Sequence, residues 1–201
     1  MTDILSLTPD AQALLFTEAR TANTFTDEPV TDEQIEAVYD LVKYGPTALN
    51  AQPLRLLLVR DEGRERLLKH MADGNRDKTA NAPLVAVLAA DTEFHEHLPQ
   101  TFPHVPEMRD RFPDPVQREE MARFNAALQI GYFLLGVRAA GLAAGPMAGF
   151  DAAGLDEEFF AGTGWKSLLV VNIGKPGDNA WFPRLPRLEL DQVMRTAEDA
   201  A

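Results

Sequence analysis

The stretch from Val116 to Ala140 reads as one long helix that is apolar on more than one side. Gly141 follows it as a stop signal. Its large apolar residues recur at helical spacing and include Met121, Phe124, Leu128, Phe133, Leu135 and Val137. A helix whose apolar surface is wider than one stripe must be covered on several sides. We therefore expect this helix to lie at the centre of the fold or at a subunit interface.

The N-terminal part of the chain carries the start signals of two helices. Thr8-Pro9 is a cap and first-turn pair, and apolar residues between Leu14 and Ala22 share one helical face. We expect this helix to position Arg20. Thr31 with Gln34 three residues later forms a capping box for the second helix.

Three apolar runs are typical of core strands, at 54–59, 84–90 and 168–173. A helical pattern at 64–71 separates the first two runs, and Asp151 can cap a short helix that continues through Phe159. Residues 184–190 read as an extended tail before a weak last helix. The mixture predicts an α+β protein.

The composition narrows the class of protein. With 201 residues, of which 45% are hydrophobic, the chain can bury a core as a single domain over 1–201. The absence of cysteine excludes disulfides and thiol nucleophiles and fits a reducing cytosol. No leader pattern or membrane-length apolar run is present, so we expect a soluble, cytoplasmic protein. The net charge of −12, with scattered basic residues, argues against a nucleic-acid partner.

A breaker-rich, uncharged polar run joins the second helix to the first strand. It reads Gly-Pro-Thr-Ala-Leu-Asn-Ala-Gln-Pro at 45–53, and such a loop can offer hydroxyl, amide and backbone groups to a ligand. Four further segments accompany it in order along the chain: Ala-Arg-Thr-Ala-Asn-Thr-Phe at 19–25, Gly-Asn-Arg-Asp-Lys at 74–78, Gly-Pro-Met-Ala-Gly-Phe at 145–150 and Arg-Leu-Pro-Arg-Leu at 184–188. Together these five pieces resemble the FMN-dependent nitroreductase family over nearly the whole chain.

The resemblance implies a nitroreductase-like fold, with a mostly antiparallel sheet between helices, in an intertwined homodimer. It also implies FMN as cofactor and NADH or NADPH as co-substrate, in ping-pong hydride transfer to a small-molecule electron acceptor. The amino-acid sequence at 145–151 and 184–188 is most similar to that of the branch that contains the malonic semialdehyde reductase of pyrimidine degradation. The expected reaction is then reduction of malonic semialdehyde to 3-hydroxypropanoate.

The flavin phosphate needs cations with planar donors, which arginine supplies better than lysine. The resemblance assigns this role to Arg20, Arg184 and Arg187, with Thr21 and Asn23 beside them. Taken from composition alone, Arg20 and Arg187 are better explained as ordinary surface ion-pair residues of an acidic protein, and the resemblance reverses that preference.

The ring of the flavin has a polar edge that Asn75 can both donate to and accept from, and Lys78 would place a cation near reduced flavin. Without the resemblance, this segment reads as a solvated turn. Pro146, Met147, Ala148 and Gly149 would present backbone N–H groups to N5 and O4 of the ring, and Gly149 lets the backbone approach closely. A plain turn is the alternative for these four residues.

By analogy with the family, Pro46, Thr47 and Asn50 reach the flavin of the partner subunit, so the site is composite. The chain departs from the common family pattern at two places. Ala148 stands where many members carry an acidic residue, and Leu54 stands where many carry Trp. These departures argue against a prototypical nitroreductase.

The segment 94–115 contains Pro99, Pro103, Pro106, Pro113 and Pro115, too many for regular structure, and reads as a lid. Its substrate candidates are Phe102, His104, Arg109 and Arg111, with exposed lid residues as the alternative. The triplet His95-Glu96-His97 lacks metal-ligand spacing, so we expect no metal. No Gly-x-Gly-x-x-Gly follows a strand, so no tightly held nicotinamide is expected.

Two other functions stay open at this point. One is a broad nitro, quinone or enal reductase, since an open flavin face accepts many small molecules. The other is a flavin-binding or flavin-processing protein without NAD(P)H turnover.

Overall fold

The structure is a computed structural model that describes residues 5–197. Its sheet has the strand order β1-β2-β4-β3, and every neighbouring pair is antiparallel. The strands are β1 (Leu54–Val59), β2 (Leu84–Asp91), β3 (Ala143–Met147) and β4 (Trp165–Gly174). The three expected strands are confirmed, and the mostly antiparallel sheet is as predicted.

The strand β3 was not expected from the sequence, and it shows that the plain-turn alternative is wrong for Pro146 and Met147. It is an edge strand of five residues that includes Gly145 and Pro146. Proline is tolerated at a sheet edge, where its missing N–H is not needed by a second neighbour. Glycine is needed at 145, because a Cβ there would lie 2.6 Å from the backbone oxygen of Ala22. The breaker residues that suggested a turn therefore mark an edge with a close backbone neighbour.

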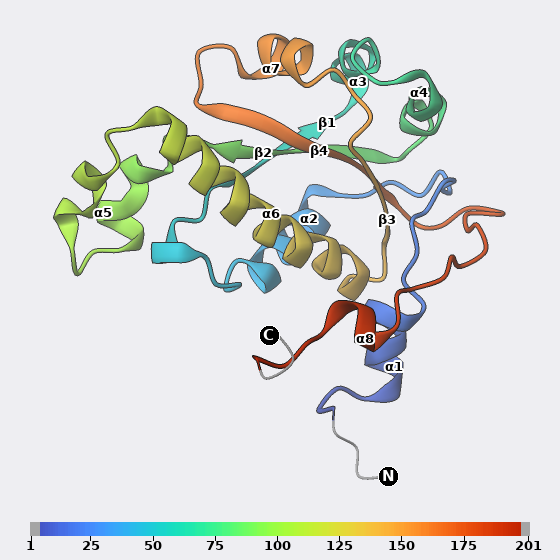
Figure 1. Ribbon diagram of the computed structural model, residues 1–201. Helices are drawn as coiled ribbons and strands as arrows, with labels where there is room; N and C mark the ends of the chain where they lie inside the picture. Colours follow the sequence, from blue (N-terminus) through green and yellow to red (C-terminus); the bar gives the residue numbers. More distant parts are fainter. Residues whose placement is uncertain (1–4, 198–201) are drawn as a thin grey trace.

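Helices cover both faces of the sheet (Figure 1). On one face, α2 (Asp32–Val42) and α6 (Pro115–Ala139) pack on the side chains of Leu84, Ala86 and Leu88. On the other face, α3 (Asp61–Leu68) and α7 (Ala152–Phe160) pack on Val85 and Val87. Because β2 is covered on both faces, all its residues are buried. The result is a three-layer arrangement with the apolar core on either side of β2.

The first helix starts as expected but ends earlier. Thr8 caps α1 (Pro9–Gln12), which continues as a π-helical turn over Ala13–Thr17. The expected helical face through Ala22 is therefore wrong. Ala22 is buried in extended backbone instead, and its N–H donates to the Ala144 oxygen at 3.0 Å. Contact with the edge strand takes precedence over the helical pattern, and Arg20 lies just after the helix.

The second helix confirms its capping box, with both Thr31–Gln34 hydrogen bonds present. The expected helix at 64–71 begins three residues earlier, at Asp61. Asp151 caps α7 as predicted, through a bond from the Gly154 N–H. The long helix α6 is central as expected, with Ala126, Phe133 and Val137 buried.

The segment 94–115 is more regular than expected. It forms η3 (Phe94–His97), α5 (Leu98–Thr101) and η4 (Pro106–Arg111). The prolines at 99 and 106 occupy first-turn positions, where a missing N–H costs nothing. Phe94 and Leu98 are fully buried and pack near Ala122 of α6. The base of this lid is therefore part of the core.

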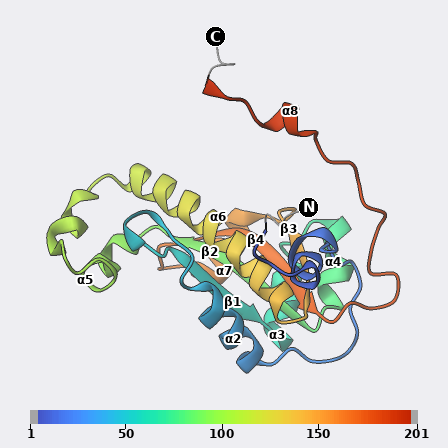
Figure 2. The same cartoon turned by 90° about the horizontal axis from the view of Figure 1, so that it is seen from below.

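The C-terminal segment is extended from Phe182 to Glu189 before α8 (Leu190–Val193), as predicted. Figure 2 shows this segment leading away from the body of the protein. Its large apolar side chains are exposed, and these are Phe182, Leu185, Leu188, Leu190, Val193 and Met194. Between residues 5 and 197, no helix combines the length and the apolar character that a bilayer crossing requires.

Candidate functional site

Three of the expected phosphate-binding residues gather at one hollow. Arg20, Arg184 and Arg187 line a space of about 150 Å³, together with Thr21 and neighbouring residues of the 19–21 and 182–187 segments. The two segments are distant in sequence but meet here, next to the end of the first helix. In a chain with a net charge of −12, three arginines around one hollow form a local cationic site.

The contacts of these arginines bear on the surface ion-pair alternative. Arg184 donates to the Thr17 oxygen at 2.5 Å and to the Ala19 oxygen at 3.2 Å, which ties the C-terminal segment to the end of the helix. Arg187 donates to the backbone oxygens of its neighbours Leu185 and Pro186. Arg20 lies 3.6 Å from Glu18, and both side chains are partly or largely exposed. Among residues 5–197, only Arg20 of the three has a carboxylate within 4.0 Å.

Asn23 braces this region and does not line the hollow. Its Nδ2 lies 3.4 Å from the oxygens of both Thr21 and Ala180, and its backbone N–H donates to the Ala180 oxygen at 3.0 Å. These bonds hold the segment before the hollow against the segment that leads to Arg184. Asn23 therefore shapes the cationic hollow through its neighbours.

A second group forms beside the end of β3. Asn75 lies on α4 (Asp73–Ala80) and donates its Nδ2 to the Gly149 oxygen at 2.9 Å. A Cβ at Gly149 would lie only 2.6 Å from that Nδ2, so glycine permits the approach. The half-buried Lys78 follows Asn75 by three residues on the same helical face. The solvated-turn alternative for residues 74–78 is wrong, because they form a helix.

The edge strand β3 connects the two groups. Ala144 accepts a bond from Ala22, close to Arg20, and Met147 leads into Ala148 and Gly149 beside Asn75. Three residues of strand span about 10 Å. Pro146 and Met147 belong to the strand, whereas Ala148 and Gly149 are exposed just beyond it. The chain thus brings the cationic hollow and the amide-rich group to one edge of the sheet.

The loop 45–53 is apart from both the cationic hollow and the group at Asn75 and Gly149. Leu49, Asn50 and Gln52 all have positive φ, at 55°, 50° and 45°. Such backbone is costly for residues other than glycine and persists only when the surroundings enforce it. Here the Asn125 Oδ1 accepts from the Ala48 N–H at 2.7 Å, and Asn50 donates to the Thr101 oxygen at 2.8 Å. The loop is held in a strained shape, which is common at ligand sites.

The lid segment borders this loop, because Asn50 donates to the Thr101 oxygen of α5, and Figures 1 and 2 both show α5 at the far end of α6 from α4. Phe102 and His104 are in ring contact, with centroids 3.9 Å apart. Arg109 pairs with Glu96 at 3.2 Å, and Arg111 is exposed. One protomer therefore does not bring Pro46, Thr47, Asn50 and the lid residues together with Arg20, Asn75 and Gly149.

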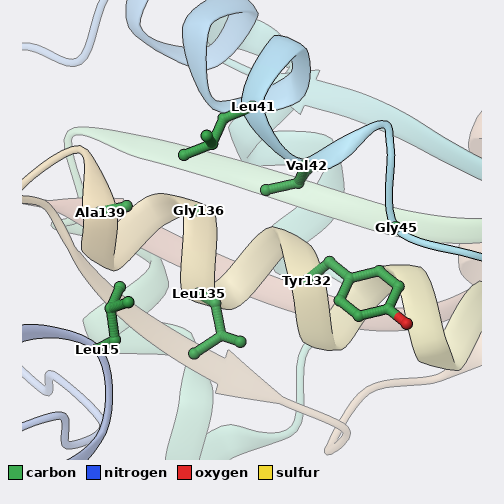
Figure 3. A pocket seen from close by; sticks show the side chains of 8 residues that line it. All are labelled: Leu15, Leu41, Val42, Gly45, Tyr132, Leu135, Gly136 and Ala139. Atoms are coloured by element: carbon green, nitrogen blue, oxygen red, sulfur yellow. The ribbon is translucent and has the colours of Figure 1, made fainter. Parts of the chain in front are cut away.

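An apolar groove runs between α2 and α6 (Figure 3). It has a volume of about 260 Å³, and Leu41 on its rim is 61% exposed. Gly45 closes one end against the Tyr132 ring, where a Cβ would lie 2.2 Å from a ring carbon. The remaining lining residues are Leu15, Val42, Leu135, Gly136 and Ala139. The groove and the exposed Phe124 and Leu128 make this side of α6 unusually apolar for a surface.

Two buried polar residues contact the group of Asn75, Lys78 and Gly149, and the sequence analysis did not identify them. Thr79 donates to the Asn75 oxygen at 2.8 Å, and Asn172 donates its Nδ2 to the Lys78 oxygen at 3.1 Å. Asn172 interrupts an otherwise apolar strand, and that interruption was a signal that could have identified it. Within the described part of the chain, no group of histidines and acidic residues is arranged to hold a metal.

The family model described as the nitroreductase family matches residues 17–175. A relative from Streptomyces griseus, provisionally named NADH dehydrogenase/NAD(P)H nitroreductase, is 66% identical over 195 residues, which are 96% of this chain and 98% of the relative. A solved structure from Exiguobacterium sibiricum, provisionally described as a nitroreductase in complex with FMN, has a TM-score of 0.80 at 18% identity and covers 94% of this chain and 98% of its own.

A solved enone reductase of a gut-bacterial fatty acid saturation metabolism also has a TM-score of 0.80, at 15% identity, over 94% of this chain and 99% of its own. At these identities the two solved structures establish the shared fold. The extent of the family match and the identity of the relative together establish more than the fold: the chain belongs to the nitroreductase family.

Proposed function

We propose that the protein is an FMN-dependent NAD(P)H oxidoreductase. The observation that carries this proposal is the pairing, along one sheet edge, of a hollow lined by three arginines with the Asn75–Gly149 group. A flavin mononucleotide has a dianionic phosphate and a ring with a polar edge, and the two groups match these two ends. The family match and the FMN complex of the solved relative from Exiguobacterium sibiricum point the same way.

Each group has a distinct role in the proposed site. Arg20, Arg184 and Arg187 would bind the phosphate through charge-assisted hydrogen bonds. Asn75 would orient the ring edge, and Lys78 would hold a positive charge beside it. FMN held by these residues would supply the redox chemistry, hydride transfer between NADH or NADPH and the acceptor. The residues of the chain would therefore bind the phosphate, orient the ring and tune its redox potential, and none is needed as a nucleophile.

We also propose a homodimer with a composite site. The loop with Pro46, Thr47 and Asn50 contacts α6 at Asn125 and α5 at Thr101. Asn75 lies on α4, at the other end of α6 from α5 (Figures 1 and 2), so a second copy is needed to bring this loop to the flavin. The apolar groove and the exposed apolar side chains of the C-terminal segment offer surface for that association. An extended arm of this kind fits an intertwined pair, in which each tail packs on the other protomer.

For the acceptor, we propose malonic semialdehyde, which is reduced to 3-hydroxypropanoate as NAD(P)H is oxidised and one proton is taken up. The support is the amino-acid sequence of the segments at 145–151 and 184–188, and Ala148, which stands where many family members carry an acidic residue. Arg111 is the better of the two lid cations for the substrate carboxylate, because Arg109 is already paired with Glu96.

The decisive experiment is anaerobic mixing of the FMN-loaded protein with NADH and, separately, NADPH, followed at the flavin absorbance. Bleaching is expected, and malonic semialdehyde should then restore the oxidised spectrum faster than a nitroaromatic, a quinone or an enal. Faster reoxidation by those compounds would replace the aldehyde with the broad-reductase function. A flavin that binds but is not bleached would identify a flavin-binding protein without NAD(P)H turnover.

A further inference from the structure

Helix α4 carries two of the proposed flavin residues but contributes almost nothing to the apolar core. Its sequence is Asp-Gly-Asn-Arg-Asp-Lys-Thr-Ala, and Thr79 is its one buried residue. None of its residues belongs to the apolar core clusters of the described chain. A short helix without an apolar face has little intrinsic stability, so its place is set by specific contacts.

Three polar contacts fasten α4 to β3, to β4 and to the residues just after β3. Asn75 donates to the Gly149 oxygen at 2.9 Å, and the Thr79 hydroxyl lies 3.8 Å from the Met147 sulfur, a weak acceptor. The third contact is the bond of 3.1 Å from the Asn172 Nδ2 to the Lys78 oxygen. The Thr79 contact and a bond of 3.1 Å from Arg64 to the Ala80 oxygen also reach the last turn of the helix, but the Asn172 amide binds the carbonyl of Lys78 itself.

Asn172 is fully buried on β4, between Val85 and Gly145 in the strand register. Strand alternation places it on the same face as Val170, in the layer that contains α3, α4 and α7. Its Oδ1 is buried and has no hydrogen-bond partner among residues 5–197. An amide in this position is unfavourable unless the bond it does make is needed.

We propose that Asn172 is a positioning residue for the flavin site. Its amide holds the Lys78 carbonyl, and through it the last turn of α4, so that the Lys78 ammonium lies beside the pyrimidine edge of the ring. A cation there favours the anionic reduced flavin over the oxidised form. The effect of Asn172 is therefore on the redox potential. This inference rests on the proposed function, because it presupposes bound FMN.

The test is the midpoint potential of FMN bound to Asn172→Ala, measured beside the wild type. The ratio of reduced to oxidised FMN affinity should fall by about threefold to tenfold, which for a two-electron couple is about 15–30 mV more negative. Amide hydrogen exchange in α4 should also become faster in the variant without flavin. Asn172→Ser, which keeps a donor in a smaller side chain, should fall between the two and serves if the alanine variant does not fold.

Ser167→Ala is the matched control. Ser167 lies on the same strand, is also buried and has an unpartnered Oγ, but its N–H contacts Asp156 of α7 instead of α4. Its loss should leave the potential unchanged. In a Lys78→Met background, Asn172→Ala should no longer shift the potential, because the effect runs through the lysine.

The outcomes separate this inference from the function on which it rests. A wild-type protein that takes up no FMN overturns the proposed function and this inference with it. If the wild type binds FMN, an unchanged potential in Asn172→Ala overturns the positioning role alone. A shift that persists in the Lys78→Met background, or that Ser167→Ala reproduces, overturns it as well.

Discussion

Removing Arg187 should weaken FMN binding without weakening the fold. In the structure, its guanidinium lines the cationic hollow and donates to the oxygens of Leu185 and Pro186, its own neighbours. These local bonds lie in an exposed segment, so Arg187→Ala should change the free energy of unfolding by no more than about 0.5 kcal/mol. The phosphate, by contrast, would lose one charge-assisted partner.

A hydrogen bond to a charged group contributes about 1.5–3 kcal/mol. The dissociation constant of FMN should therefore rise by about tenfold to 150-fold in Arg187→Ala. Titration of the flavin-free protein into FMN, followed by flavin fluorescence, measures this constant. Thermal melting of the same flavin-free samples measures the fold.

Arg123→Ala is the matched control for the loss of one surface arginine. Arg123 lies on the N-terminal half of α6, is 43% exposed and pairs with Glu119 at 2.7 Å. Its removal should leave FMN affinity within about twofold of the wild type, because Arg123 does not line the hollow. The loss of its surface ion pair should lower the free energy of unfolding by about 0–1 kcal/mol. Equal FMN affinity in Arg187→Ala and Arg123→Ala would refute the assignment of the hollow to the phosphate.

Three further changes test other parts of the structure. Gly45→Ala should lower the melting temperature through a loss of about 1–3 kcal/mol, because its Cβ would press on the Tyr132 ring, and an unchanged melt would show that the ring moves aside freely. The hydrogen bond from Arg66 lowers the pKa of Glu158, so this pair stabilises the fold above the ordinary carboxyl pKa and loses its effect as the pH falls through the lowered pKa. Arg66→Ala should make acid unfolding between pH 5 and pH 3, taken as a rough window around the ordinary pKa, shallower than in the wild type. Arg111→Ala should raise the KM for malonic semialdehyde about tenfold while sparing nitroaromatics, and equal kinetics with both acceptors would remove Arg111 from the substrate site.

The parts of the fold that depend on local signals could be predicted from the sequence. The capping box at Thr31 and Gln34, the caps at Thr8 and Asp151 and the three apolar strands all follow from short-range chemistry, and the structure contains them. The misplaced elements depend on contacts between distant segments. Ala22 leaves the helical pattern because Ala144 offers it a backbone partner, and Gly145 is in a strand because Ala22 lies against it.

The candidate site likewise contains residues that local motifs identified and residues that only contacts between distant segments reveal. The structure brings together Arg20, Arg184 and Arg187, which the motifs had grouped as phosphate candidates. It also places Asn75 against Gly149, a contact that the motifs did not predict, and the roles of these residues toward a flavin stay predictions. Thr79 and Asn172 were missed because their importance lies in partners on other elements. The positive φ angles of Leu49, Asn50 and Gln52 were equally hidden, since none of these residues is glycine and tertiary contacts impose the shape.

The fully buried strand β2 has a consequence for how the chain is made. Its run from Leu84 to Ala90 is apolar and uncharged, which is the composition of segments that self-associate when unpaired. During synthesis β1 is available at once, but the other partner, β4, begins only at Trp165. One edge of β2 thus stays open while the intervening chain emerges. Pro83 and Asp91 flank the run and act as gatekeepers, because a proline and a charge both oppose edge-to-edge pairing with another nascent chain.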